Sequence, residues 1–223
     1  MERGPRRDSG TLAAMPSARM APTPASPPSP TPEGARTARV DRAAAAAAIE
    51  AFLRALGRDE AELDGTGARV ADMFVDDLCA GYGVDTKKLV AEAVMPASAP
   101  GLVVVRDIPV VTTCPHHLVP SIGTATVGFE ARSRIVGLGT VAALVDAHAR
   151  RLALQEHIGE SVVADLEQAL APRWVGCRIV LSHACMIARG ERAIGTRVET
   201  VALRGPPEVA AEARAVLGVG GAP

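Results

Sequence analysis

Aromatic residues are scarce in this sequence, where three phenylalanines, one tyrosine and one tryptophan make up 2% of 223 residues. Hydrophobic residues of all kinds nevertheless reach 48%, which is enough for one sizeable core in a chain of this length. We therefore expect a core built from alanine, valine, leucine and isoleucine side chains.

An excess of charge of one sign and long apolar runs are also missing. The formal net charge is −1, and the only lysines are Lys87 and Lys88. This balance provides no excess of positive charge that would indicate a nucleic-acid partner. No stretch of about 18 consecutive apolar residues occurs, so we expect no transmembrane helix and no membrane partner.

Cysteine is scarce as well. The four cysteines are unevenly spaced and do not form the pattern of a disulfide-rich framework; they are Cys79, Cys114, Cys177 and Cys185. Such usage is typical of a reducing cytoplasm, where thiols stay free or bind a metal. We therefore predict a cytoplasmic protein.

The chain changes character along its length. Residues 1–40 are rich in proline, serine, alanine, threonine and arginine and have almost no large apolar side chains, so they cannot bury enough surface to offset their ordering entropy. We expect a disordered tail at 1–40, a helical region at 41–95, a domain that carries the motifs below at 96–206 and a C-terminal tail at 207–223.

Two helices are predicted in the N-terminal region. The first begins after Asp41, a good N-cap residue, continues through a run of alanines and ends at Gly57. The second is expected in "TGARVADMFVDDLCAGYG", which places apolar side chains on one helical face. That face consists of Val70, Met73, Phe74 and Leu78.

The remaining elements follow the order β-β-α-α-β-β, which indicates an α+β fold. Stretches rich in valine and isoleucine predict the strands, and apolar residues at helical spacing predict the helices. The last helix has a stripe formed by Ile158, Val162, Leu166 and Leu170. The expected strands are 102–112, 122–131, 177–187 and 196–204, and the expected helices are 140–148 and 154–170.

Two short clusters carry most of the residues that could do chemistry. Cys114 and His117 form a C-x-x-H pair at the end of a predicted strand. His183 and Cys185 lie two residues apart within another predicted strand, so their side chains should share a face. Either cluster alone also fits a plain structural reading, in which the thiols are buried and the histidine is satisfied within the sheet.

Taken together, Cys114, His117 and Cys185 form a Cys₂His set. Three protein ligands and an open fourth position are typical of a catalytic zinc site. Zinc lowers the pKa of a water molecule in such a position towards neutrality. His116 and His183 lie next to a ligand or two residues from one. Because imidazole titrates near neutral pH, these two histidines are candidate proton-transfer groups.

Three segments in this order resemble those that define the GTP cyclohydrolase I family: "VVVRDIPVVTTCPHHLVP", "GLGTVAALVDAHARRLALQEHI" and "LSHACMIARG". The likeness extends over residues 59–205 and includes "GTGARVADMFVDDLCAGY". It implies the tunnelling fold, in which ββααββ units join their sheets into an oligomeric barrel. The resemblance also implies a homo-oligomer, specifically a decamer.

The resemblance implies the same zinc ligands and proton-transfer histidines as the spacing does, and it adds residues that bind the substrate. Glu156 would hold the guanine ring, because a carboxylate can accept from a ring N–H and an amino group together, and Gln155 beside it would also bind the substrate. Arg189 would bind phosphate, and Arg69 would be supplied by a neighbouring subunit. Without the resemblance, each of these charged residues would be read as a solvated surface group.

The implied reaction is the hydrolytic opening of the guanine imidazole ring of GTP at C8. Formate is released, and a sugar rearrangement and reclosure give 7,8-dihydroneopterin triphosphate. The histidines would carry protons as the ring opens, and Zn²⁺ would be the cofactor.

The sequence departs from the family pattern at two places. Pro115 replaces an acidic residue, which removes a charge and an N–H group. Gly139, Thr140 and Ala143 stand where the family has a serine, a lysine and an arginine near the triphosphate and sugar. Loss of two cations there should weaken triphosphate binding unless other arginines compensate. The candidates for compensation are Arg150, Arg151 and Arg192.

Three interpretations stay open from the sequence. The first is a GTP cyclohydrolase with rearranged phosphate contacts. The second is a divergent hydrolase that opens the imidazole ring of another purine, with fewer phosphates. The third is a non-catalytic homologue that binds a ligand, against which the presence of both His116 and His183 argues.

Overall fold

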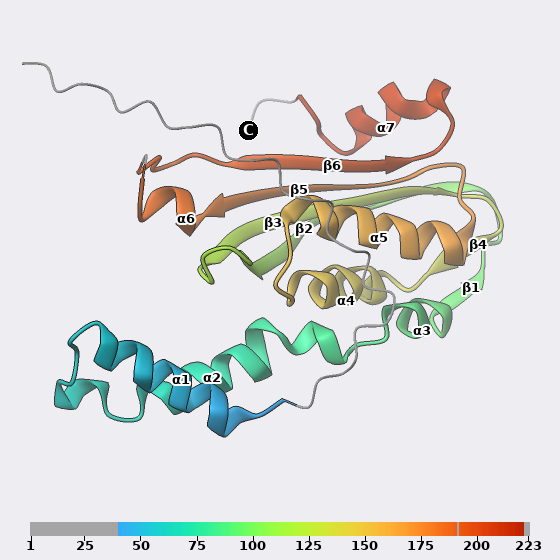
Figure 1. Cartoon of the computed structure of the whole chain (residues 1–223). Coiled ribbons are helices and arrows are strands. Elements are labelled where there is room, and N and C mark those ends of the chain that lie inside the picture. Colours follow the sequence, from blue (N-terminus) through green and yellow to red (C-terminus); the bar gives the residue numbers. More distant parts are fainter. Residues whose placement is uncertain (1–39, 191, 221–223) are drawn as a thin grey trace, which may run out of the picture. The chain divides into compact units, whose positions relative to one another are not determined.

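The computed structural model describes residues 40–190 and 192–220 (Figure 1). The disordered tail predicted at 1–40 lies outside the described residues, except for Val40. Within the described part, no helix combines the length and the apolar character needed to cross a membrane.

The first predicted helix is confirmed as α1, Arg42–Ala55. The Asp41 side chain caps it by accepting from the backbone N–H of Ala44 at 2.9 Å. The chain leaves the helix through Gly57, whose φ of +70° lies in the left-handed region that glycine tolerates.

The second predicted helix is divided in the structure. It runs as α2, Thr66–Asp72, then as a π-helical turn, η2, and then as a 3₁₀ turn, η3. None of the four side chains expected on its apolar face is fully buried within one chain, and Met73 is 42% exposed. The bounds of the turns and of the next helix are η1 Ala61–Leu63, η2 Met73–Leu78, η3 Ala80–Gly83 and α3 Thr86–Ala91.

The predicted β-β-α-α-β-β order is confirmed by an antiparallel four-stranded sheet with the strand order β2-β3-β5-β6. Helices α4 and α5 cover one face of this sheet (Figure 1). Two short strands that the sequence did not indicate, β1 and β4, pair with each other. The bounds are β1 Val94–Pro96, β2 Gly101–Thr113, β3 Pro120–Ala131, β4 Arg134–Val136, α4 Leu138–Ala149, α5 Gln155–Leu170, β5 Val175–His183 and β6 Val198–Arg204.

The core lies between the two helices and the sheet and is mainly aliphatic, as expected. The predicted stripe of α5 is at most 1% exposed, and it packs with sheet residues such as Val127 and Ile179, both at 0%. Its apolar side chains therefore fix α5 against the sheet, and the N-terminus of that helix is fixed with them.

The last part of one predicted strand is wrong. Strand β5 ends at His183 rather than continuing to Ile187, and Ala184–Ile187 forms a single helical turn, α6. His183 pairs with Ser121, and the next residue of the partner strand is Pro120, its first residue. Proline has no backbone N–H to extend a ladder, so the pairing stops there and the chain turns.

Residues at the C-terminal end also fold. Pro207–Val209 forms a 3₁₀ turn, η4, and Ala210–Val216 forms the helix α7. Val209 and Ala213 are buried against Trp174. The segment predicted as a tail therefore includes a helix that packs on the sheet domain.

Candidate functional site

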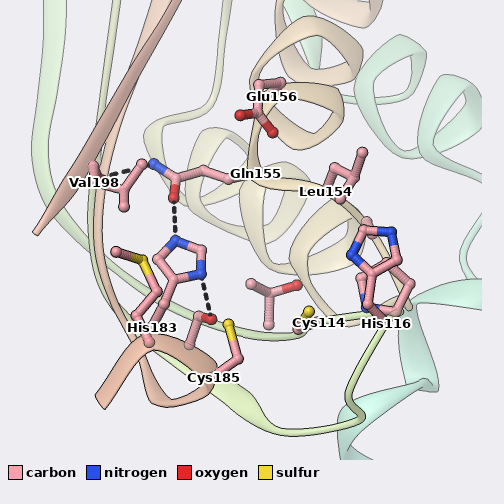
Figure 2. A pocket seen from close by; sticks show the side chains of 13 residues that line it. Cys114, His116, Leu154, Gln155, Glu156, His183, Cys185 and Val198 are labelled. Atoms are coloured by element: carbon pink, nitrogen blue, oxygen red, sulfur yellow. Dashed lines mark hydrogen bonds between the residues drawn. The ribbon is translucent and has the colours of Figure 1, made fainter. Parts of the chain in front are cut away.

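The residues predicted to do chemistry gather at one end of the helix-covered face of the sheet. Thr112, Ser121 and His183 occupy one row across β2, β3 and β5. The first turn of α5 closes the space above this row (Figure 2). The result is a cavity of about 210 Å³, lined among others by Cys114, His116, Gln155, Glu156, His183 and Cys185.

Three predicted metal ligands come together beside this cavity. The sulfur atoms of Cys114 and Cys185 and a ring nitrogen of His117 all lie within 4.8 Å of one another. Cys114 and His117 belong to a tight loop after β2, closed by the backbone N–H of Leu118 donating to the Cys114 carbonyl at 2.9 Å. Two thiols and one imidazole are a donor set that suits zinc.

The expected shared strand face of His183 and Cys185 is wrong. Cys185 lies in the helical turn α6, after the end of β5. It is this turn, rather than strand alternation, that places the Cys185 sulfur near the Cys114 sulfur.

The surroundings of the thiol pair disfavour two thiolates in the absence of a cation. Burial raises the pKa of the Cys185 thiol, and the neighbouring Cys114 raises it further, while Arg189 acts in the opposite direction. Metal binding needs thiolates, and a dication reverses the cost of placing two of them together. The three residues therefore fit a zinc ion.

His183 is the most firmly held of the predicted proton-transfer groups. Its Nδ1 lies 2.9 Å from the Ser121 hydroxyl, and its Nε2 lies 2.8 Å from the Gln155 side-chain oxygen. Burial lowers the pKa of His183, and the charge of Glu156 partly opposes this effect. Both ring nitrogens of His183 are therefore engaged by protein groups.

His116 is placed differently. Its ring is exposed, lines the cavity and meets the ring of His117 edge-on, with 6.3 Å between the ring centroids. The structure thus brings both predicted proton-transfer histidines to the same cavity, one held rigidly and one open to solvent.

The predicted substrate-binding residues divide between the cavity and its surroundings. Glu156, the second residue of α5, is exposed and lines the cavity next to Gln155 (Figure 2). The guanidinium of Arg189 donates to Nε2 of His117 at 2.7 Å, so it lies at the metal-ligand group. Arg69 lies on α2 and donates to Thr66, and it does not line the cavity in the described part of its own chain.

Two arginines considered as replacements for the missing phosphate contacts have structural roles. Arg150 donates to the backbone carbonyls of Asp76 and Asp77. Arg151 donates to the carbonyls of Gly81 and Ala147. Both guanidinium groups therefore hold the turns that follow α2, and neither lines the described cavity.

Ser121 is a residue of this site that the sequence analysis missed. It is 1% exposed and lies directly opposite His183 across β3 and β5. The signal in the sequence is a serine at a core-facing position of a strand otherwise rich in apolar residues, but its partner depends on strand register.

Comparisons with known proteins find a matching family and several similar bacterial proteins. The sequence model of the GTP cyclohydrolase I family matches residues 45–217. A protein of Leifsonia xyli named GTP cyclohydrolase 1 is 33% identical over 188 residues, which cover 82% of this chain and 98% of that protein. The protein of the same name from Geobacillus kaustophilus is 37% identical over 172 residues, or 75% of this chain and 90% of that one.

Two further comparisons concern another bacterial relative and a solved structure. GTP cyclohydrolase 1 of Teredinibacter turnerae is 36% identical over 143 residues, covering 64% of this chain and 77% of that protein. Among solved structures, the apo form of the archaeosine synthase QueF-Like aligns with a TM-score of 0.41 and 20% identity, over 49% of this chain and 98% of the other. The extent of the family match and the identity to these bacterial relatives lead to one conclusion: the chain is a member of the GTP cyclohydrolase I family of hydrolases.

Proposed function

We propose that this protein is a zinc-dependent GTP cyclohydrolase, which opens the guanine imidazole ring at C8, releases formate and forms 7,8-dihydroneopterin triphosphate. The observation that carries the proposal is the convergence of the Cys₂His group, two histidines and Glu156 on one cavity, in a chain of this family.

Each residue has a defined part in this proposal. Cys114, His117 and Cys185 would hold the zinc ion, which supplies a Lewis acid that makes water a stronger nucleophile near neutral pH. His183 would exchange a proton with the reacting base from a fixed position, and His116 would exchange protons with solvent. The four thiols are free in the structure, which also fits the reducing cytoplasm that we propose as its location.

The size of the cavity supports a purine base, rather than a whole nucleotide, as the group bound inside it. Its volume of about 210 Å³ is below the roughly 300–1,000 Å³ of ordinary ligand pockets. The cavity of one chain therefore suits the flat base, with Glu156 accepting from the ring N–H and amino group. The sugar and phosphates would lie at the mouth, within reach of Arg189.

We also propose that the mouth is completed by other copies of the chain, in a homo-oligomer and specifically a decamer. Strands β2 and β6 are the edges of the described sheet, and unpaired edges favour association. On the face away from the helices, Val111 and Ile122 are 42% and 58% exposed. Arg69 would reach the cavity of a neighbouring subunit. A monomer that is stable and active in sedimentation would contradict this assembly.

A second candidate function is ring opening of a purine compound that carries fewer phosphates. The observation that favours it is the engagement of Arg150 and Arg151 with backbone carbonyls, which removes two of the three arginines considered as replacements for the contacts missing at Gly139, Thr140 and Ala143. A purely ligand-binding role has less support, because the cavity holds two histidines suited to proton transfer.

The test is an assay of the purified full chain with GTP, in which formate release and pterin fluorescence are followed separately. We expect both products from the unmodified protein and from Cys79→Ser, since Cys79 lies outside the cavity. We expect neither product from Cys185→Ser. Formate without pterin would favour the second candidate, and absence of both from the unmodified protein would contradict the proposal.

A further inference from the structure

Ser121 and His183 form a buried polar pair across two strands. They are directly opposite in the antiparallel pairing of β3 and β5, where facing side chains lie close together. The Ser121 hydroxyl lies 2.9 Å from Nδ1 of His183. With Ser121 only 1% exposed, its hydroxyl has little access to water, so the imidazole is its evident partner.

The other side of the imidazole contacts Gln155, whose amide can adopt only one orientation. The Gln155 side-chain NH₂ lies 3.0 Å from the carbonyl oxygen of Ile179 and 3.1 Å from that of Val198. Carbonyl oxygens accept and never donate, so the amide nitrogen must face them. The amide oxygen therefore faces Nε2 of His183, at 2.8 Å.

This orientation determines which nitrogen of His183 carries the hydrogen. An amide oxygen only accepts, so Nε2 must be the N–H donor. In the neutral ring Nδ1 is then the bare nitrogen, and it accepts from the Ser121 hydroxyl. In Figure 2 the Gln155 amide lies on one side of the ring and the Cys185 sulfur on the other, so the bare nitrogen is on the side of the metal-ligand group.

We propose that Ser121 and Gln155 are positioning residues that hold His183 in the Nε2–H tautomer, with the unprotonated Nδ1 accepting from the Ser121 hydroxyl on the metal-ligand side of the ring. Gln155 thereby acts through His183, and Glu156 is left as the residue of α5 that contacts the base. The inference rests on the proposed function only for the role of His183. The arrangement of Ser121 and Gln155 on the two sides of the ring, called the clamp below, rests on the hydrogen bonds.

The kinetic test compares Ser121→Ala with Ser121→Thr in the full, zinc-loaded chain with GTP. Loss of one hydrogen bond to the ring should lower kcat by about tenfold and leave KM within about twofold. Threonine keeps the hydroxyl, so Ser121→Thr should retain most of kcat. An unchanged kcat in Ser121→Ala, or a change confined to KM, would overturn the role of Ser121.

A matched control separates the clamp from general damage to the sheet. Ser182 is next to His183 in β5 and pairs with Ile122, one step along both strands, so its side chain is on the opposite face. Ser182→Ala removes the same hydroxyl from the same pair of strands and should leave kcat unchanged. An equal loss in both alanine variants would attribute the effect to the sheet and overturn the clamp.

A second measurement does not depend on turnover. The chain has five histidines, so solid-state ¹⁵N spectra of histidine-labelled, zinc-loaded protein can be assigned with single substitutions. We expect His183 as one tautomer with the hydrogen on Nε2, and a mixture in Gln155→Ala. A hydrogen on Nδ1 in the unmodified protein would overturn the inference. Absence of formate from GTP, with the expected tautomer present, would instead contradict the proposed function and leave the clamp standing.

Discussion

At the scale of single residues, the site combines side chains that the sequence identifies with one that it does not. The C-x-x-H spacing made Cys114 and His117 recognisable, and the family likeness singled out Glu156. Ser121 was not predictable, because its role depends on the β3–β5 register that places it opposite His183. Spacing along the chain reports local neighbours, whereas cross-strand neighbours depend on pairing.

The first prediction at this scale concerns zinc content. Cys185→Ser should reduce bound zinc well below one ion per chain, because it removes one of three protein ligands. Cys177→Ser is the matched control, since Cys177 is 0% exposed in the core and belongs neither to the ligand group nor to the lining of the described cavity. Metal analysis of both variants checks this, and full zinc retention in Cys185→Ser would remove Cys185 from the ligand set.

The second prediction concerns the buried pair formed by His148 and Asp165, which joins α4 to α5 at 2.8 Å. Burial acts to raise the pKa of Asp165, but hydrogen bonds from His148 and Thr86 outweigh it and hold that pKa below its ordinary value of 3.8. A carboxyl whose pKa is lower in the folded state stabilises the fold above the unfolded value, and this contribution is lost as pH falls through the folded value.

Asp165→Asn should therefore lower the free energy of unfolding at neutral pH by roughly 1–3 kcal/mol, and the difference should shrink below the ordinary pKa of 3.8. Denaturant unfolding at several pH values and one fixed chain concentration measures it. A difference that stays constant down to the acid limit would show that the carboxylate charge contributes nothing.

At the scale of secondary-structure elements, the spacing of apolar residues predicted the helix whose apolar face is buried within one chain. It failed where the helix geometry changes or where the pairing of a strand ends. The stripe of α5 is buried as expected, because one chain supplies its partner surface. The stripe expected after Thr66 is only partly buried within one chain, and a π-helical turn interrupts it. Strand β5 ends early because its partner strand begins with Pro120, which the composition of β5 alone cannot reveal.

A prediction at this scale tests the contact between η3 and the end of α4. A Cβ on Gly81 would lie 2.1 Å from the carbonyl oxygen of Ala147 and 2.7 Å from that of Arg150, and neither backbone atom can easily move. Gly81→Ala should therefore lower the free energy of unfolding by roughly 1–3 kcal/mol. Gly83→Ala is the control, since nothing lies within 4 Å of its Cβ position. Equal unfolding free energies for the two variants would contradict the close packing.

At the scale of the whole molecule, the order of the elements and the members of the metal-ligand group could be predicted from one chain, although the helical turn that places Cys185 could not. The phosphate site could not, because it would lie at the mouth of the cavity, where other subunits would contribute. The single chain places Arg189 beside His117, and Arg69 lies on α2, away from the described cavity lining. In the proposed homo-oligomer, neighbouring copies of the chain would therefore set how many cations a substrate meets.

The corresponding prediction compares guanosine, GMP and GTP in the full protein. If Gly139, Thr140 and Ala143 mark a lost phosphate contact, affinity should depend little on phosphate number. The triple variant Gly139→Ser, Thr140→Lys, Ala143→Arg should then favour GTP, since each charged contact contributes up to roughly 1.5–3 kcal/mol. Binding and turnover of the three ligands measure this. A preference of about a hundredfold or more for GTP in the unmodified protein, about 2.7 kcal/mol, would contradict the divergent-substrate interpretation.

The measurement that tests the central proposal most directly is formate release from GTP before and after removal and restoration of zinc. We predict that chelated protein releases no formate and that one equivalent of zinc per chain restores the rate, because Cys114, His117 and Cys185 form one ligand group per chain. The Cys185→Ser variant, treated in the same way, should recover little or no activity. Formate release at an undiminished rate from metal-free protein, or from Cys185→Ser, would contradict a zinc-dependent cyclohydrolase.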